Sequence, residues 1–134
     1  MPQAKTKAAS LKLTAAEMQM MRLLWSLGPA TAKQVHEAAL RERPDLAYAA
    51  VLRLLQVMHS KGQLSRDESQ KAHVYAALAE QAKVQTSLIS DLAQKAFAGS
   101  AKALVMTALR SHVSKAERAE IQRLLSQEHD ADEN

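Results

Sequence analysis

Four side chains between Leu46 and Gly62 have the types and the spacing to read the edges of DNA bases. Ala49, Arg53, Gln56 and Ser60 recur at i, i+4, i+7 and i+11, which places them on one face of a helix. Arginine can donate two parallel hydrogen bonds to guanine, glutamine can pair with adenine in the same way, and alanine can contact a thymine methyl. The alternative is an ordinary solvated helix face, and this segment taken alone favours that alternative.

The surrounding segments change that balance, because they predict a helix-turn-helix. On the same helix, Val51, Leu54, Leu55 and Met58 form a buried apolar face. A short helix is expected before it, opened by a capping box at Thr31–Gln34 and ended by Arg43-Pro44-Asp45. Two short helices joined by a tight turn, the second with an unburied face, are what this motif requires. The amide groups near Thr31 would then lie across the phosphate backbone.

An earlier helix and a later hairpin complete the predicted first domain. Thr14–Glu17 is another capping box, and the helix that it opens ends at Gly28-Pro29 with Trp25 as a core anchor. After Gly62 the pattern favours strands over Gln63–Arg66 and His73–Leu78, joined by a polar connection. This hairpin would be the wing of a winged helix, with Arg66 and Lys71 placed to reach phosphates.

The remainder of the chain is predicted to be helical and to need a partner. Three amphipathic helices are expected, the first from Glu80, the second from Ser100 and the third from the capping box at Ser114–Glu117. They carry more apolar surface than three short helices can bury, and a second copy of the chain is the simplest partner. The residues expected in this dimer interface are Leu88, Leu92, Phe97, Leu104, Val105, Leu109, Ile121, Leu124 and Leu125.

The predicted fold class is therefore mainly α with a small β-hairpin, an N-terminal winged helix-turn-helix followed by a C-terminal helical dimerisation region. We expect a flexible basic tail over residues 1–10, the DNA-binding domain over 11–79 and the dimerisation region over 80–128. An acidic, frayed end is expected over 129–134.

Composition and charge restrict the classes of function. The net charge is +4, and all of the excess lies in residues 1–80, where 11 Lys and Arg face 7 Asp and Glu. That asymmetry points to a polyanionic partner for the first domain. There is no cysteine, the five histidines have no short ligand spacing, and the three glycines form no phosphate-binding loop. We therefore expect no enzyme activity, no metal and no cofactor. No membrane span or signal peptide is apparent, which predicts a cytoplasmic protein.

The ordered motifs of the chain resemble the penicillinase repressor family (BlaI/MecI/CopY). The resemblance is carried by LTAAEMQMMRLLW, TAKQVHEAALRER, LAYAAVLRLLQVMHSKGQL and AHVYAAL, and then by FAGSAKALVMTAL and EIQRLL near the C-terminus. It implies a homodimeric winged-helix repressor whose two recognition helices enter successive major grooves of a palindromic operator, about 34 Å apart. In some members, a regulatory protease cuts the dimerisation region, and the separated monomers release the DNA.

The sequence departs from this family at several positions. Members often carry a Thr-Thr pair where this chain has Ala49-Ala50, so base reading would depend on Tyr48, Arg53, Gln56 and the methyl of Ala49. The scissile pair of some members falls by analogy at Thr107-Ala108. A wing Gly-Arg pair is replaced by Gln70-Lys71, and the cysteine pattern of copper-sensing members is absent.

The sequence therefore predicts a dimeric repressor that occupies double-stranded operator DNA. Tyr48, Ala49, Arg53 and Gln56 would face the bases, while Thr31, Lys33, Lys61, Arg66 and Lys71 would contact phosphates, which position the protein without specifying sequence. The alternative is a winged-helix module for protein–protein interaction, whose basic surface serves solubility.

Overall fold

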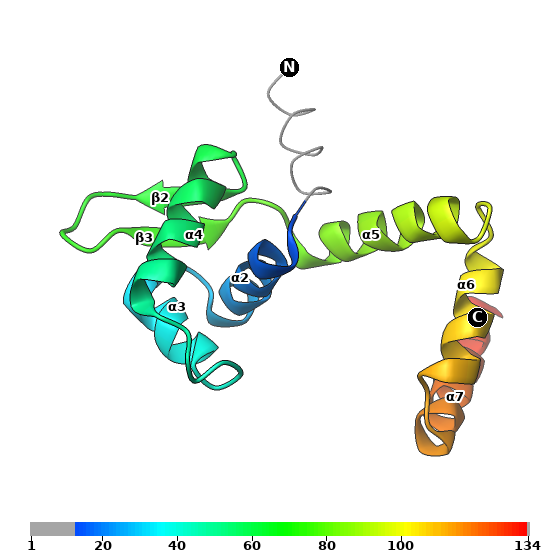
Figure 1. Cartoon of the computed structure of the whole chain (residues 1–134). Helices are drawn as coiled ribbons and strands as arrows, with labels where there is room; N and C mark the ends of the chain where they lie inside the picture. Colours follow the sequence, from blue (N-terminus) through cyan, green and yellow to red (C-terminus); the bar gives the residue numbers. More distant parts are fainter. Residues whose placement is uncertain (1–12, 134) are drawn as a thin grey trace. The chain divides into compact units, whose positions relative to one another are not determined.

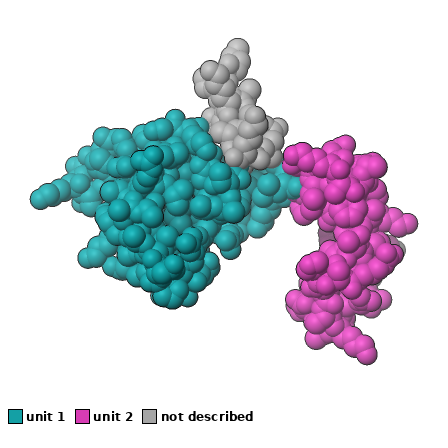
Figure 2. All heavy atoms as spheres, in the orientation of Figure 1, with its two compact units in different colours: residues 1–88 teal, residues 89–134 magenta. Residues whose placement is uncertain are grey.

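The computed structural model describes residues 13–133, and the side chains of residues 13–129. The chain divides into two compact units, one up to Leu88 and one from Ile89 onward, which Figure 2 shows in teal and magenta. The predicted tail over residues 1–10 lies outside the described residues. The predicted boundary at residue 80 differs from the observed one, because the first turns of a long helix belong with the first unit, where Val84 is buried.

From residue 13 onward, unit 1 contains three helices and a small antiparallel sheet, followed by the start of a fourth helix (Figure 1). Its elements in chain order are α2 (Ala15–Leu27), β1 (Ala30–Thr31), α3 (Ala32–Ala39), α4 (Tyr48–Ser60), β2 (Leu64–Asp67), β3 (Val74–Ala77) and the first half of α5 (Gln81–Ala96). The predicted class, mainly helical with a small hairpin, is confirmed.

Both predicted capping boxes of this unit are present and explain where its first two helices begin. The Thr14 hydroxyl accepts from the Glu17 amide and the Glu17 carboxylate accepts from the Thr14 amide, at 3.1 and 3.0 Å. Thr31 and Gln34 make the same reciprocal pair at 3.2 and 2.9 Å. Each box satisfies amide groups that a helix start leaves without partners. Gly28 ends α2 with a φ of +76°, a left-handed conformation that glycine adopts without a Cβ clash.

The core of unit 1 lies between α2, α3, α4 and the sheet. Its largest fully buried side chains include Met20, Leu24, Val35, Leu55 and Tyr75. Methionine and leucine do most of the filling, as expected from a chain so poor in aromatic residues. Trp25 is only partly buried; it packs against this core, and its Nε1 donates to the Ala79 carbonyl at 3.0 Å.

The sheet has one strand more than the sequence predicts. β2 and β3 form the expected hairpin, with Arg66 opposite Tyr75, and β1 pairs with the other edge of β3. The order is β1-β3-β2. β1 has two residues, Ala30 and Thr31, which is too short for an alternating pattern to reveal. It ties the start of α3 directly to the wing, because Thr31 is both the partner of Val74 and the N-cap of α3.

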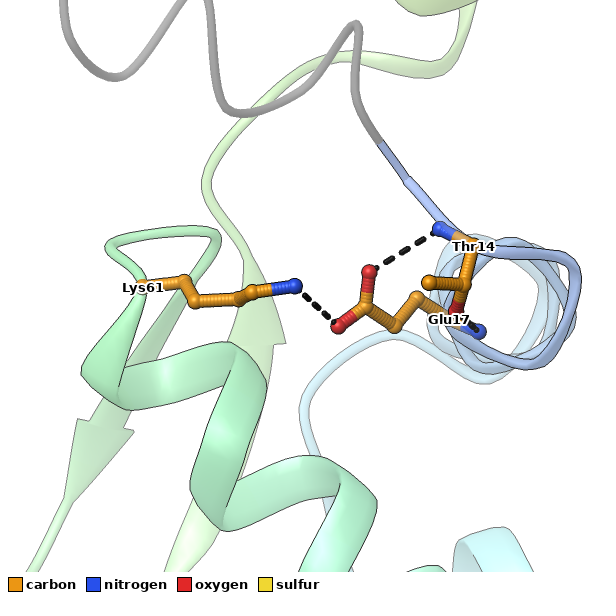
Figure 3. A network of polar contacts seen from close by, with 3 residues as sticks. All are labelled: Thr14, Glu17 and Lys61. Carbon is orange, nitrogen blue, oxygen red and sulfur yellow. Dashed lines mark hydrogen bonds and ion pairs between the residues drawn. The ribbon is translucent and has the colours of Figure 1, made fainter.

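A partly buried ion pair joins the start of α2 to the end of α4 (Figure 3). Lys61 Nζ lies 2.7 Å from Glu17 Oε2, and the Glu17 side chain is 3% exposed while that of Lys61 is 44% exposed. The charges suit the helix ends, since a carboxylate is favourable at an N-terminus and an ammonium at a C-terminus. Burial alone would raise the pKa of Glu17, but the hydrogen bonds from Lys61 and from the Thr14 amide lower it below the ordinary value of 4.5.

Unit 2 consists of the rest of α5 with α6 (Ala101–Ser111) and α7 (Lys115–Glu133). The third predicted capping box is present, with Ser114 and Glu117 paired at 2.9 and 3.1 Å, and Ser100 caps α6. Arg118 donates to the Leu109 carbonyl at 2.5 Å and so links the start of α7 to the end of α6. α7 continues to Glu133, and the frayed end expected over 129–134 stays a prediction. Among the described residues, no helix combines the length and apolarity needed to cross a membrane.

Replacing Glu17 with Gln should destabilise unit 1 at neutral pH by about 1.5–3 kcal/mol, the range for hydrogen bonds to a charged group. Because the folded-state pKa is lowered, this stabilisation is complete above the ordinary value of 4.5 and is lost as the pH falls below it. Urea unfolding can be followed by the fluorescence of Trp25, the only tryptophan. The difference in free energy of unfolding between wild type and E17Q should therefore be smaller at about pH 4 than at about pH 7.

Glu37→Gln makes the same chemical change on an exposed glutamate of α3 and should leave the unfolding midpoint nearly unchanged. If E17Q lowered the free energy of unfolding equally at both pH values, the role assigned to the ionised carboxylate would be contradicted.

Candidate nucleic-acid interface

Helix α4 has the two faces that its sequence predicts. Val51, Leu55 and Met58 are 0% exposed, whereas Ala49, Arg53, Gln56 and Ser60 are all exposed. Leu54, predicted for the buried face, is only partly buried and packs at the edge of the core. An exposed helix face carrying a guanidinium, a carboxamide and small side chains can reach hydrogen-bonding groups in a major groove.

The start of α4 is held by a neighbouring helix rather than by its own N-cap. Ala47 occupies the N-cap position and supplies no side-chain hydrogen bond. Instead His36, on α3, lies with Nε2 2.8 Å from the Leu46 carbonyl and contacts the ring of Tyr48 edge-on at 5.8 Å. A carbonyl can only accept, so Nε2 carries the proton in this contact. Sequence reasoning treated His36 only as a rejected metal ligand and missed this contact.

A hollow of about 290 Å³ gathers side chains from three separate parts of unit 1. Thr31 and Lys33 come from the start of α3, Tyr48 and Gln56 come from α4, and Lys71 comes from the connection before β3. Five of the residues predicted to face DNA are thus brought to one place, two for bases and three for phosphates. Ala72, His73 and Leu52 also line the hollow and were not singled out from the sequence.

Two other predicted phosphate contacts already have carboxylate partners. Lys61 pairs with the buried Glu17, as described above. Arg66 pairs with Glu68 at 2.7 Å on the wing, and the hydrogen bond from Arg66 lowers the pKa of Glu68. Neither side chain lines the hollow. For Lys61, the pair with a buried carboxylate must first be separated before a phosphate can bind. For Arg66, the neighbouring Glu68 carboxylate repels a phosphate.

The wing connection is shaped by a local hydrogen bond instead of a hairpin glycine. The Ser69 amide donates to Asp67 Oδ1 at 2.9 Å, an Asx turn, and the hydrogen bonds from Ser69 lower the pKa of Asp67. Lys71 follows shortly after this turn and is exposed. The replacement of a family glycine by Gln70 therefore still leaves a defined turn.

None of the nine residues predicted for the dimer interface is buried: four are exposed and five are partly buried. Leu88 precedes the unit on α5 and is partly buried. Ala93 is the one buried residue among the described side chains from Ile89 onward, and α6 has none. Of the predicted set, Leu92, Val105, Leu124 and Leu125 are exposed, the last by 61%, and Phe97, Leu104, Leu109 and Ile121 are partly buried. Ile89 and Met106 are further exposed apolar side chains.

The pair predicted by analogy as a cleavage position lies inside a helix. Thr107 and Ala108 belong to α6, and the Thr107 carbonyl accepts a hydrogen bond from Ser111 Oγ at 2.6 Å. Regarding metals, the described residues contain no group of three or more His, Asp or Glu side chains placed to hold an ion.

Comparison with known proteins identifies the family. The chain matches the penicillinase repressor family over residues 13–127, a range that begins just before α2 and ends within α7.

The chain belongs to the penicillinase repressor family.

The predicted resemblance is thereby confirmed, and a family of repressors also agrees with the expectation that the chain is no enzyme.

Relatives and solved structures agree with this penicillinase repressor assignment. The transcriptional regulator BlaI of Mycobacterium tuberculosis, from strains CDC 1551 / Oshkosh and H37Rv, is 37% identical over 92 residues. That match covers 67% of this chain and 66% of the relative, slightly less than two thirds of its length.

Two solved structures show the same fold at low identity. A MarR family protein from Bacillus stearothermophilus is 14% identical with a TM-score of 0.54, covering 99% of this chain and 86% of that one. The complex structure of hsRosR-S4 is 12% identical with a TM-score of 0.54, and the match covers 94% of this chain and 97% of that one. Identities this low establish the winged-helix fold alone.

Proposed function

We propose that this chain is a homodimeric transcriptional repressor that occupies a palindromic DNA operator. The observation that carries the proposal is the hollow beside α4, where Tyr48 and Gln56 meet Thr31, Lys33 and Lys71. Groups that suit base edges and groups that suit phosphates lie there side by side, as a helix inserted in a major groove requires. Membership of a repressor family supports the same function.

Base reading is assigned to the exposed face of α4. Arg53 would bind guanine and Gln56 adenine, each through paired hydrogen bonds, while Ala49 would contact a thymine methyl. Tyr48 lies at the start of the helix, is 45% exposed and lines the hollow, so its ring and hydroxyl can reach the floor or the rim of the groove.

Phosphate binding is assigned to Lys33, Lys71 and the capped start of α3 at Thr31. These groups lie beside the base-reading face, whereas Lys61 and Arg66 pair with Glu17 and Glu68. We therefore leave the latter two out of the proposed phosphate set. Phosphate contacts of this kind fix the register of α4 on the duplex without reading sequence.

A second copy of the chain is the proposed partner of unit 2. Its described part has one buried residue and six large apolar side chains that are exposed, three of them leucines, which leaves three amphipathic helices without a core of their own. Pairing two copies would bury these faces and hold two α4 helices together, as a palindromic operator needs. Any signal that separates the copies would release the operator, because each half-site contact is weak without the other. Cleavage at Thr107-Ala108 would first require α6 to unwind.

DNA binding by the full-length chain should depend steeply on salt. Two lysines per subunit neutralise four phosphates per dimer, which predicts a slope of about −3.6 for the logarithm of affinity against the logarithm of salt concentration. Lys71→Ala should weaken binding to every duplex alike and reduce that slope by about 2. Duplexes selected from genomic fragments and titrated by fluorescence anisotropy provide the measurement.

Lys95→Ala removes an exposed lysine of α5 that pairs with Asp91 within its own helix, and it should leave the slope unchanged. Absent or salt-independent binding by the wild type would instead favour the winged-helix module for protein–protein interaction.

Arg53→Ala should cost about 1–3 kcal/mol on the selected operator and relax the preference at one base pair per half-site. The reason is that paired hydrogen bonds to one base are lost while the phosphate contacts remain. Footprinting, together with affinities for every single-base variant of the operator, measures both effects. Arg22→Ala, an exposed arginine of α2, is the matched control. An equal loss for Arg53→Ala on operator and random duplexes would show that Arg53 contacts phosphate only.

Leu125→Glu should convert the dimer to monomer, because it places a charge on the most exposed leucine of α7 while keeping a good helix former. Operator affinity should then fall by about 10²–10⁴, the advantage of two linked contacts. Sedimentation equilibrium gives the oligomeric state and anisotropy the affinity. Gln127→Glu adds the same charge on the same helix and should leave both unchanged; a variant L125E that remains dimeric would refute the proposed interface.

A further inference from the structure

The structure assigns a specificity-determining role to His36: we propose that its imidazole positions the start of α4, and with it Tyr48, for base reading. The inference rests on the proposed DNA-binding function but concerns a residue that does not itself lie in the hollow. Its basis is the pair of contacts that His36 makes on either side of Ala47, the N-cap of α4.

The start of α4 has little of its own to hold it. Ala47 gives no side-chain cap, the first turn contains no acidic residue, and the preceding connection runs from Leu40 to Ala47 without a strand or helix. By contrast, α2, α3, α6 and α7 each begin with a serine or threonine whose hydroxyl accepts from the backbone. A helix start without such a cap depends on tertiary contacts for its position.

His36 supplies two such contacts from a fixed base. Its residue lies in α3, between the buried Val35 and Ala39, so its backbone is held by the core. Nε2 donates to the carbonyl of Leu46, and the ring meets that of Tyr48 at an interplanar angle of 80° with centroids 5.8 Å apart. The first contact fixes the chain just before the N-cap, and the second fixes the side chain just after it. An edge-to-face ring pair at this separation is attractive.

The consequence is that His36 sets the orientation of a residue that faces the hollow. Tyr48 lines the hollow together with Gln56 and Lys71, although nearly half of its surface is exposed. Without a neighbour to hold it, an exposed ring would sample several rotamers, and a base-reading contact would lose its preorganisation. Loss of His36 should therefore reduce sequence discrimination more than it reduces attraction to the phosphate backbone.

The test uses full-length His36→Ala, His36→Gln and the wild type, with His59→Ala in the last turn of α4 as the matched loss of a histidine. His36→Ala should weaken binding to the selected operator about tenfold, roughly the net worth of one hydrogen bond, and change affinity for a random duplex less than about twofold. Glutamine can still donate to the Leu46 carbonyl, so H36Q should recover part of the lost affinity. H59A should match the wild type on both duplexes.

A double-variant cycle identifies the route of the effect. If His36 acts through Tyr48, His36→Ala in a Tyr48→Ala background should change operator affinity by much less than in the wild type. Fully additive effects, an equal loss on operator and random duplexes, or no loss at all would each overturn the proposal. Urea unfolding gives the folded fraction of H36A, and the affinities are compared after correction for that fraction. Should H36A fail to fold, the same comparison is made with H36Q, which should then lose affinity for the operator but not for the random duplex.

Hydrogen exchange separates this inference from the proposed function. The Ala50 and Val51 amides both donate to the Ala47 carbonyl, at 3.1 and 3.3 Å, and so report on the first turn of α4 without any DNA. Their exchange should be about tenfold faster in H36A than in the wild type. A wild type that binds no DNA would refute the proposed function, and unchanged exchange in H36A would refute the positioning of α4 by His36.

Discussion

Burial of one face of α4 is the constraint on which the rest of unit 1 depends. With Val51, Leu55 and Met58 completely inside the core, the helix cannot rotate about its axis without exposing apolar surface, at about 25 cal/mol for each Å². The opposite face must therefore stay outward, and its polar side chains need not pack. The core thus determines which residues are available for recognition, while leaving their identities free to vary.

The remaining contacts of unit 1 fix the ends of this helix in space. Lys61, its C-cap, is paired with the buried Glu17 of α2, and Leu46, just before its N-cap, is bonded to His36 of α3. β1 joins α3 to the wing, so the hollow beside α4 has one wall built from α3 and another from the chain that enters β3. Each wall carries a lysine. Lys33 and Lys71, which are far apart in the sequence, consequently lie beside the exposed face of the same helix.

Much of this was predictable because the signals are local. Three capping boxes, the glycine after α2 and the apolar spacing of α4 each involve residues a few positions apart, and the helices begin where those patterns place them. The features that sequence reasoning missed are non-local. Glu17 and Lys61 are 44 positions apart, and Trp25 and Ala79 are 54 apart. Nothing in the spacing of Lys61 distinguishes a cation with a buried partner from one free to meet phosphate, and a two-residue strand such as β1 has no periodicity to detect.

The two units differ in how much apolar surface they bury within themselves, and this difference affects how the chain could bind DNA. Unit 1 has a core of its own, built from α2, α3, α4 and the sheet. Unit 2 does not, since the described part of its helices holds one small buried residue against several exposed branched ones. Helices with so much exposed apolar surface are stable only when a partner covers them, so the folding of unit 2 would be coupled to association. Operator affinity would then depend on protein concentration as well as on sequence, because a monomer has one recognition helix and a dimer has two.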